Sequence, residues 1–179
     1  MLFRSVANAV FEQADAIMLS GETTVGKYPA QCVGVFDRIA QRIERSGGAN
    51  FQERAELNTP RQKLVKSAVV MAEELQAAAI LVFTIRGNMA RHTAWMRPRH
   101  SPIYAICEAQ AVADSLTLNW GVTSIVIAFD HADPEKTISL ALTMLTAKGL
   151  LKKGNTTVVI SSIAAGEQIV DAVQMRMVT

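Results

Sequence analysis

The chain has 179 residues, of which 50% are hydrophobic and 19% charged, and its formal net charge at pH 7 is +2. This composition excludes a disordered chain, and the near balance of charge argues against a dedicated nucleic-acid binder. Two cysteines are too few for a disulfide framework, and charged residues interrupt the longest apolar runs, so neither a transmembrane helix nor a secretory leader is expected. We therefore expect a globular protein of the cytoplasm without a nucleic-acid or membrane partner.

The first 45 residues alternate between helical and extended patterns. Apolar residues recur at helical spacing over 3–14, and the run 15–19 predicts a short buried strand before the polar turn 20–23. A second helix is expected from Pro29, because proline suits the first position of a helix. A lone strand leaves its backbone groups unpaired, so this helix–strand–helix unit is no domain by itself. We expect residues 1–45 to be cut from a larger βα repeat of a longer protein; the alternative is that they dock onto the remaining α/β domain or onto a partner chain.

The segment 46–58 has no apolar periodicity and is interpreted as a linker. A strong helix start follows it. Thr59 is the expected N-cap, Pro60 takes the first helical position, and Gln62 is placed to complete a capping box. A second domain is therefore predicted over 59–179.

Strands and helices alternate regularly within this predicted domain. Strands are expected at 79–84, 103–107, 124–129 and 156–161, with helices at 88–96, 110–118 and 134–151, the last of them capped by Asp133. The final segment, Ile169–Met177, alternates apolar and polar residues as an antiparallel edge strand does. The predicted fold class is α/β, a three-layer α/β/α sandwich with a mostly parallel five-stranded sheet and an antiparallel edge strand.

Several sequence strings resemble the pyruvate kinase family. They begin with Val6-Ala-Asn-Ala-Val10, Ala14-Asp-Ala-Ile-Met-Leu-Ser-Gly-Glu-Thr23 and Gly26-Lys-Tyr-Pro29, and continue with Arg97-Pro98, Pro102–Ile106, Asn119–Val122, Ala147–Gly149 and Lys152–Asn155. The strings follow the order and spacing of the end of the family's catalytic barrel and of its C-terminal domain. The resemblance therefore covers essentially the whole chain.

The resemblance implies that 1–45 is the last βα portion of a (β/α)8 barrel and that 59–179 is the C-terminal domain. Pyruvate kinases transfer a phosphoryl group from phosphoenolpyruvate to ADP with magnesium and usually potassium. Their C-terminal domain supplies a subunit interface of the tetramer and a pocket for a phosphorylated effector. Their catalytic lysine, metal-binding carboxylates and phosphate-binding arginines lie on earlier strands of a barrel that takes about 250 residues. We expect the 179-residue chain alone to be inactive and to hold no metal or cofactor.

The first candidate site is the turn of Ser20, Gly21, Glu22 and Thr23. In the family this serine and glutamate line the mouth of the active site, and a carboxylate beside a hydroxyl can support a proton-carrying network there. The alternative is that Ser20 and Glu22 only satisfy backbone amides of the turn. For the fragment alone, this alternative is the expected one. Many members carry a lysine where this chain has Val25.

The second candidate site is the strand end, turn and helix start at Thr84, Arg86, Gly87 and Asn88. Free amides and the helix dipole at such a place favour phosphate. The family's corresponding loop holds the phosphate of a sugar-phosphate or nucleotide activator; Thr84 and Gly87 match it, whereas Arg86 and Asn88 replace other residues. The alternative is a helix start with Arg86 in solvent. Downstream, 161–168 lacks the family's glycine-rich loop with its Thr-Asn pair, so a fructose-bisphosphate site of the usual kind is not implied.

Three functions are compatible with the sequence. The first is the C-terminal portion of a pyruvate kinase, which supplies effector binding and a subunit interface. The second is a stand-alone, non-catalytic phosphometabolite-binding module of the same ancestry. The third is an unrelated nucleotide-binding enzyme, against which the sequence offers no Gly-x-Gly-x-x-Gly or Walker motif. For the first, we also expect apolar surface on residues 1–45 that another chain would cover, contributed by Val10, Ile17, Leu19, Val35 and Phe36.

Overall fold

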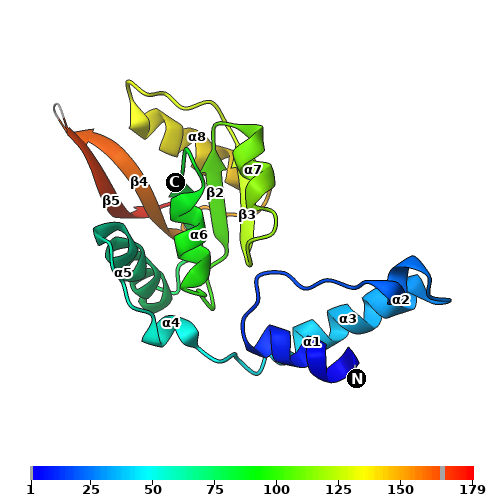
Figure 1. Ribbon diagram of the computed structural model, residues 1–179. Helices are drawn as coiled ribbons and strands as arrows, with labels where there is room; N and C mark the ends of the chain where they lie inside the picture. Colours follow the sequence, from blue (N-terminus) through cyan, green and yellow to red (C-terminus); the bar gives the residue numbers. More distant parts are fainter. Residues whose placement is uncertain (1, 166–167) are drawn as a thin grey trace. The chain divides into compact units, whose positions relative to one another are not determined.

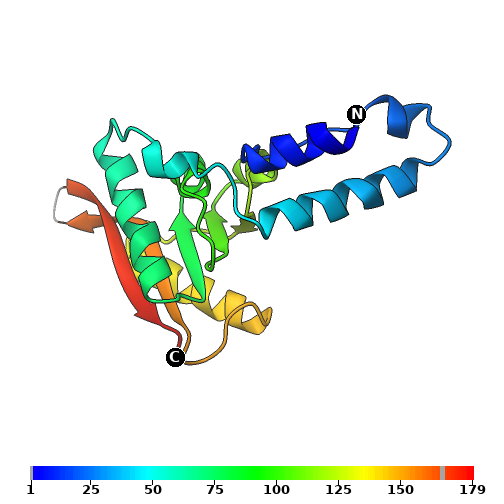
Figure 2. The ribbon, with the colours of Figure 1, turned by 90° about the horizontal axis from the view of Figure 1, so that it is seen from below.

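The computed structural model describes residues 2–165 and 168–179, which form two compact units. The first unit ends at Glu56 and the second runs from Leu57 to Thr179. Figures 1 and 2 show the first as a set of helices and the second as a sheet covered by helices. The division falls inside the segment 46–58.

The first unit contains helices α1 (Leu2–Phe11), α2 (Gly21–Thr24), α3 (Pro29–Glu44) and α4 (Phe51–Arg54). The two longer helices, α1 and α3, lie side by side (Figures 1 and 2). Each has a marked apolar face, and the buried hydrophobic side chains there are Val6 on α1 and Ile39 on α3. Two buried side chains of this size make only a small core.

The strand predicted at 15–19 is wrong. Residues 16–20 have no regular secondary structure, and no ladder of the described sheet includes them. The apolar run is consistent with a strand, but a strand needs a neighbour to pair its N–H and C=O groups, and this unit offers none. The helix before it also stops three residues early, because Gln13 is left-handed at φ 64° and the Ala14 amide donates back to the Ala9 carbonyl at 3.0 Å.

The start of the segment interpreted as a linker is structured. Helix α4 forms one turn within it, and Asn50 before that turn is left-handed at φ 53°. Two hydrogen bonds join it to the end of α1: the Ala49 amide donates to the Phe11 carbonyl at 2.8 Å, and the Phe51 amide donates to Gln13 Oε1 at 3.1 Å. These bonds explain why residues before Glu56 belong to the first unit.

The second unit is the predicted three-layer sandwich. In chain order it contains α5 (Pro60–Glu74), β1 (Ala79–Phe83), α6 (Asn88–Trp95), β2 (Ile103–Cys107), α7 (Gln110–Leu116), β3 (Val122–Val126), α8 (Pro134–Ala147), β4 (Thr156–Ala165) and β5 (Gln168–Met177). The sheet has the order β3-β2-β1-β4-β5. The first four strands are parallel, and β5 pairs antiparallel with β4 along its full length. The predicted antiparallel edge strand is therefore confirmed.

Both faces of the sheet are covered by helices. On one face, side chains of β1, β2 and β4 pack against α5, α6 and α7, and on the other they pack against α8. Ile80 and Leu81 are adjacent on β1 and point to opposite faces, yet each is 0% exposed. This burial explains the continuous apolar runs, which are typical of parallel strands covered on both sides.

Local signals account for several element boundaries. The predicted capping box is confirmed: Thr59 Oγ1 accepts from the Gln62 amide at 3.2 Å, and Gln62 Oε1 accepts from the Thr59 amide at 3.0 Å. Helix α8 ends before the predicted 151, because Gly149 is left-handed at φ 71° and the Leu150 amide turns back to Leu145. Strand β3 ends at Val126 rather than 129, because its partner β2 ends at Cys107 in the same register.

Candidate functional site

A cavity of about 490 Å³ lies at the carboxyl ends of β1 and β4. Its lining comes from the turns after β1 and β3, the first turns of α5 and α8, and residues of β4 and β5. The place follows from the topology. From β1 the chain moves through β2 and β3 to one side, and β4 returns on the other side of β1. In open α/β sheets, ligands bind in the crevice at such a switch point.

The predicted loop residues Thr84, Arg86 and Asn88 all line this cavity. Thr84 is buried, and its Oγ1 accepts a hydrogen bond from the Gly87 amide at 2.9 Å. Gly87 is left-handed at φ 81°, and an added Cβ would meet Arg91 Nη1 at 3.0 Å. The turn thus requires glycine, and it directs the start of α6 towards the cavity. The structure brings the predicted residues together as one turn.

Arg86 supplies an uncompensated positive charge to the cavity. Its guanidinium forms no ion pair or hydrogen bond with any other residue of the described chain. Its neighbour Arg91 differs, since the Arg91 side chain donates to the Arg86 carbonyl at 3.2 Å and to Ser115 Oγ at 2.9 Å. Arg91 therefore stabilises the turn, while Arg86 is available to an anion.

Three cavity residues were missed by the sequence reasoning. Arg61, in the first turn of α5, donates from Nε to Asp171 Oδ2 of β5 at 2.6 Å, and Ser162 Oγ of β4 donates to Asp171 Oδ1 at 2.8 Å. The hydrogen bond from Arg61 lowers the pKa of Asp171 despite partial burial, and the same contact raises the pKa of Arg61. Arg61 and Asp171 are 110 positions apart, so no short-range sequence pattern predicts that they pair. The only indication in the sequence was an acidic residue in the predicted edge strand.

The loop after β3 forms another wall. The Asp130 carboxylate accepts from the amides of Ala132 and Asp133 at 3.0 and 2.8 Å, and Lys136 Nζ lies 3.7 Å away. The Asp133 amide is the main cause of a lowered pKa for Asp130. Asp133 occupies the expected N-cap position of α8 but makes no side-chain cap bond, and the amides that Asp130 satisfies lie before the helix. The aromatic rings of Phe83 and Phe129 complete this wall, 6.1 Å apart between centroids.

Ser161 is a polar residue without a partner in the cavity lining. It is 4% exposed, and its Oγ has no hydrogen-bond partner in the part of the chain that the structure describes. A buried hydroxyl normally finds a partner, and leaving one unsatisfied costs about 1–3 kcal/mol. An unsatisfied group beside a cavity is consistent with a ligand or water as its partner.

The other predicted turn is local in its contacts. Glu22 Oε2 accepts from the Ser20 amide at 3.1 Å, and the hydroxyls of Thr23 and Thr24 donate to the Ser20 carbonyl. Hydrogen bonding to its own amide and then to Ser20 lowers the pKa of Glu22. The Glu22 carboxylate thus accepts a hydrogen bond from a backbone amide of its own turn.

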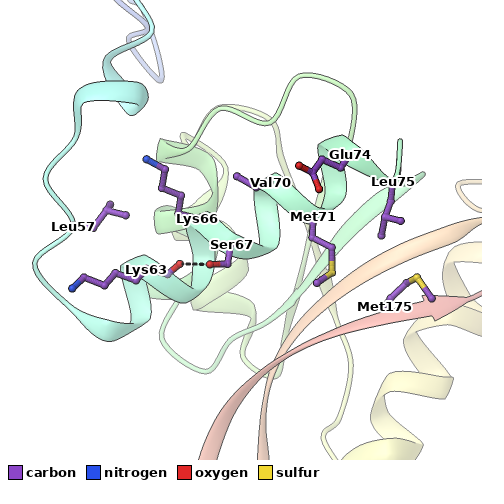
Figure 3. A pocket seen from close by; sticks show the side chains of 9 residues that line it. All are labelled: Leu57, Lys63, Lys66, Ser67, Val70, Met71, Glu74, Leu75 and Met175. Atoms are coloured by element: carbon purple, nitrogen blue, oxygen red, sulfur yellow. Dashed lines mark hydrogen bonds between the residues drawn. The ribbon is translucent and has the colours of Figure 1, made fainter.

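A shallow groove of about 810 Å³ lies between α5 and β5 (Figure 3). Figure 3 shows Met71 and Leu75 of α5 on the side of the helix that faces Met175 of β5, with Lys63 and Lys66 nearer the start of α5. Met175 is 56% exposed. The groove is mainly apolar, and it is a binding surface of a different kind from the charged cavity.

No group of three or more His, Cys, Asp or Glu side chains that could hold a metal ion occurs in residues 2–165 and 168–179. Within the same residues, no helix combines the length and apolar character needed to cross a membrane.

Comparisons with known proteins agree on one family. The family described as "Pyruvate kinase, alpha/beta domain" matches residues 62–173. The chain is 32% identical over 161 residues to pyruvate kinase 2 of Synechocystis sp., covering 90% of this chain and 27% of that protein. It is 37% identical over 160 residues to the chloroplastic pyruvate kinase isozyme G of Ricinus communis, covering 88% and 38%. The chain thus spans well under half the length of these relatives.

A solved structure of Cryptosporidium parvum pyruvate kinase is similar to the whole fold. It has a TM-score of 0.82 and 26% sequence identity, over 99% of this chain and 36% of that one. The family match covers more than half of the chain and coincides with the sandwich described above. The protein therefore belongs to the pyruvate kinase family, and residues 62–173 form its alpha/beta domain.

Proposed function

We propose that the chain is the C-terminal portion of a pyruvate kinase that transfers a phosphoryl group from phosphoenolpyruvate to ADP in glycolysis, in the cytoplasm. The match to the family's alpha/beta domain carries this proposal. In it, residues 1–45 are the last βα portion of the catalytic barrel, 46–58 the linker, and 59–179 the regulatory domain. Ser20 and Glu22 then border the active site only within an intact enzyme.

Effector binding is the first role proposed for the second unit. The cavity at the switch point combines the Arg86 guanidinium, the amides at the start of α6 and the unpartnered Ser161 hydroxyl, which together suit a phosphate group. Its volume lies within the range of about 300–1,000 Å³ usual for small-molecule sites. Its walls combine polar and charged side chains with aromatic rings, which can bind both parts of a phosphorylated metabolite.

Self-association is the second role. Strand β5 pairs with β4 on one side and with no described strand on the other, and Val170, Met175 and Met177 are exposed along it. An edge strand with exposed apolar side chains favours pairing with a second copy. The groove against α5 adds apolar area to the same edge (Figure 3). We therefore propose a homo-oligomer, a tetramer in the complete enzyme.

The 179 residues by themselves are proposed to be non-catalytic. In this proposal they include only one portion of the catalytic barrel, so no step of the reaction is assigned to them. Magnesium and potassium belong to the parent enzyme in this proposal. A coupled assay of the chain with phosphoenolpyruvate, ADP and both ions should give no turnover above the blank; measurable turnover would contradict this part.

Ligand titration tests the effector role. Isothermal calorimetry of the full chain with glucose 6-phosphate and with AMP should detect binding, and Arg86→Ala should weaken it at least tenfold. Arg38→Ala is the matched control, because Arg38 is an exposed residue of α3 in the first unit. This variant should leave the affinity unchanged. Absence of binding by every phosphate ester, fructose 1,6-bisphosphate included, would overturn the effector role.

Light scattering tests the interface. Met175→Asp places a charge in the α5–β5 groove and should shift the chain towards the monomer. Leu118→Asp is the control, since Leu118 is 71% exposed and lies outside that groove. An oligomer that survives Met175→Asp, or a wild-type monomer at all concentrations, would count against this surface.

A further inference from the structure

We propose that the cavity accepts a metabolite with one phosphate group, and that Asp171 is the residue that excludes a second. The inference rests on the proposed effector role and adds the class of ligand. It starts from the unequal charges on two sides of the same cavity. Arg86 lies on the β1 side and the Arg61–Asp171 pair on the β5 side.

On the β1 side, the groups suited to phosphate have no competing partner. The Arg86 guanidinium has no ion pair among the described residues. The amide end of α6 follows directly, and the buried Ser161 hydroxyl, also without a partner, lines the same cavity. A phosphate here would gain charge-assisted hydrogen bonds without breaking any interaction of the protein.

On the β5 side, the cation is already neutralised. Arg61 Nε lies 2.6 Å from Asp171 Oδ2, and Ser162 donates to the other carboxylate oxygen at 2.8 Å. The Asp171 side chain is only 19% exposed, so its charge is weakly screened by solvent. A phosphate that approached Arg61 would have to displace Asp171 and lie beside its negative charge. Like-charge contact of this kind is a common means of rejecting the wrong ligand.

The two sides are separated by one strand. Strands β1 and β5 flank β4, so they lie about 10 Å apart. A bisphosphate with its two groups at opposite ends of a sugar would therefore direct one phosphate to Arg86 and the other to Asp171. Asp130 adds a second carboxylate to the cavity wall, with Lys136 already paired to it. Only the first phosphate meets an available cation.

The rest of the ligand faces an uncharged wall. Phe83, Phe129 and Ile138 also line the cavity. An uncharged sugar or ring can lie against such side chains, whereas a second dianionic group would lose its hydration there without a compensating partner. The cavity thus fits a monophosphate with an uncharged remainder.

Calorimetry of the full chain with two probes tests the proposal. Wild type should bind glucose 6-phosphate at least tenfold more tightly than fructose 1,6-bisphosphate. Asp171→Asn releases Arg61 and should tighten bisphosphate binding at least tenfold, while glucose 6-phosphate binding changes less than threefold. The double variant Arg61→Gln/Asp171→Asn should lose the gain, because the released cation is absent. Ser162→Ala keeps the carboxylate and should retain the monophosphate preference.

Each result distinguishes this inference from the effector role. Equal or tighter binding of the bisphosphate by wild type would overturn the inference and leave the effector role standing. The same holds if Asp171→Asn, folded by circular dichroism, gains nothing for the bisphosphate, or if the double variant gains as much. If Asp171→Asn does not fold, Arg61→Gln decides: it leaves the Asp171 carboxylate without its cation, so bisphosphate affinity should fall further while glucose 6-phosphate binding changes less than threefold, and an unchanged or higher bisphosphate affinity would overturn the inference. Failure of both probes to bind would overturn both proposals.

Discussion

The two units of this chain reach their folds by different means. In the first, helices form from local amphipathic patterns, and the buried hydrophobic side chains described there are Val6 and Ile39. In the second, a sheet is covered on both faces by helices, and every residue of β2 is buried. Met18 and Val25 of the first unit are each 87% exposed. The comparison shows that amphipathic helices form with only a small core, whereas a strand needs neighbouring strands to pair with.

The exposed apolar residues of the first unit match the expectation only in part. Of the five residues expected to be exposed, Val35 is exposed and the other four are half-buried. Larger exposure falls on Met18, Val25 and Tyr28, which the expectation did not name. These side chains lie in or beside the irregular segments around α2, where no second element covers them.

Hydrogen exchange tests the difference in stability between the two units most directly. The slowest amides of β1 and β2 should exchange at the rate of global unfolding, because their strands are buried on both faces. The slowest amides of α1 and α3 should exchange about 10⁴-fold faster, since local opening exposes little apolar surface. Mass-spectrometric exchange on the full chain measures both. Equal protection in the two units would contradict the difference drawn here.

Shortening a buried side chain in the sheet tests whether the two units unfold independently. Leu81→Ala removes a fully buried side chain of β1 and should lower the free energy of unfolding by about 3 kcal/mol. Both tryptophans lie in the second unit, so urea unfolding followed by their fluorescence reports on that unit. Ile39→Ala in the first unit is the control and should move this transition by less than about 0.5 kcal/mol. A large shift with Ile39→Ala would show that the two units unfold together.

The second unit also contains a pH-dependent set of hydrogen bonds around the Glu73 carboxylate. Glu73 Oε1 accepts from the Arg99 amide at 2.6 Å, and Glu73 Oε2 lies 2.7 Å from His100 Nδ1. Burial raises the pKa of Glu73, but the hydrogen bonds from His100 and Arg99 together outweigh it, so the pKa lies below its ordinary 4.5. The stabilisation is therefore present above about pH 4.5 and is lost as the pH falls through the lowered pKa.

Glu73→Gln tests the contribution of these hydrogen bonds to stability. It should lower the free energy of unfolding by about 1–2 kcal/mol at pH 7, because hydrogen bonds to a charged acceptor are lost. As the pH falls from 4.5 through the lowered pKa of Glu73, the wild-type carboxylate takes up a proton, so the difference between the two proteins should shrink towards pH 3. Urea unfolding at both pH values provides the measurement, with Glu74→Gln, at an exposed position, as the control. A difference that stays constant with pH would exclude the ionised carboxylate as its source.

The smallest effect concerns the junction between the two units. Thr59→Ala removes one half of the capping box at the start of α5 and should cost about 1 kcal/mol of stability. Thr59→Ser retains the hydroxyl and should cost less than half as much. The same fluorescence-monitored unfolding applies. Equal losses for both variants would show that the methyl group, rather than the cap, is responsible.

Much of the second unit was predictable because its signals are local. The capping box at Thr59, the continuous apolar strands and the alternating final strand each depend on neighbouring residues, and all three are confirmed. The turn at Thr84–Asn88 was found in the same way. The strand at 15–19 was not predictable from its own residues, because pairing is a property of neighbours that this unit does not contain.

The sequence alone determined the family, the order of elements in the second unit and the basic turn at the end of β1. Only the tertiary structure decided the charge of the cavity around that turn. Arg61 and Asp171 are far apart in the chain, and they meet because β5 returns antiparallel beside β4 while α5 packs on the same side of the sheet. Short-range patterns specify helices, strands and caps, whereas an ion pair between α5 and β5 exists only once the sheet has placed the two elements together.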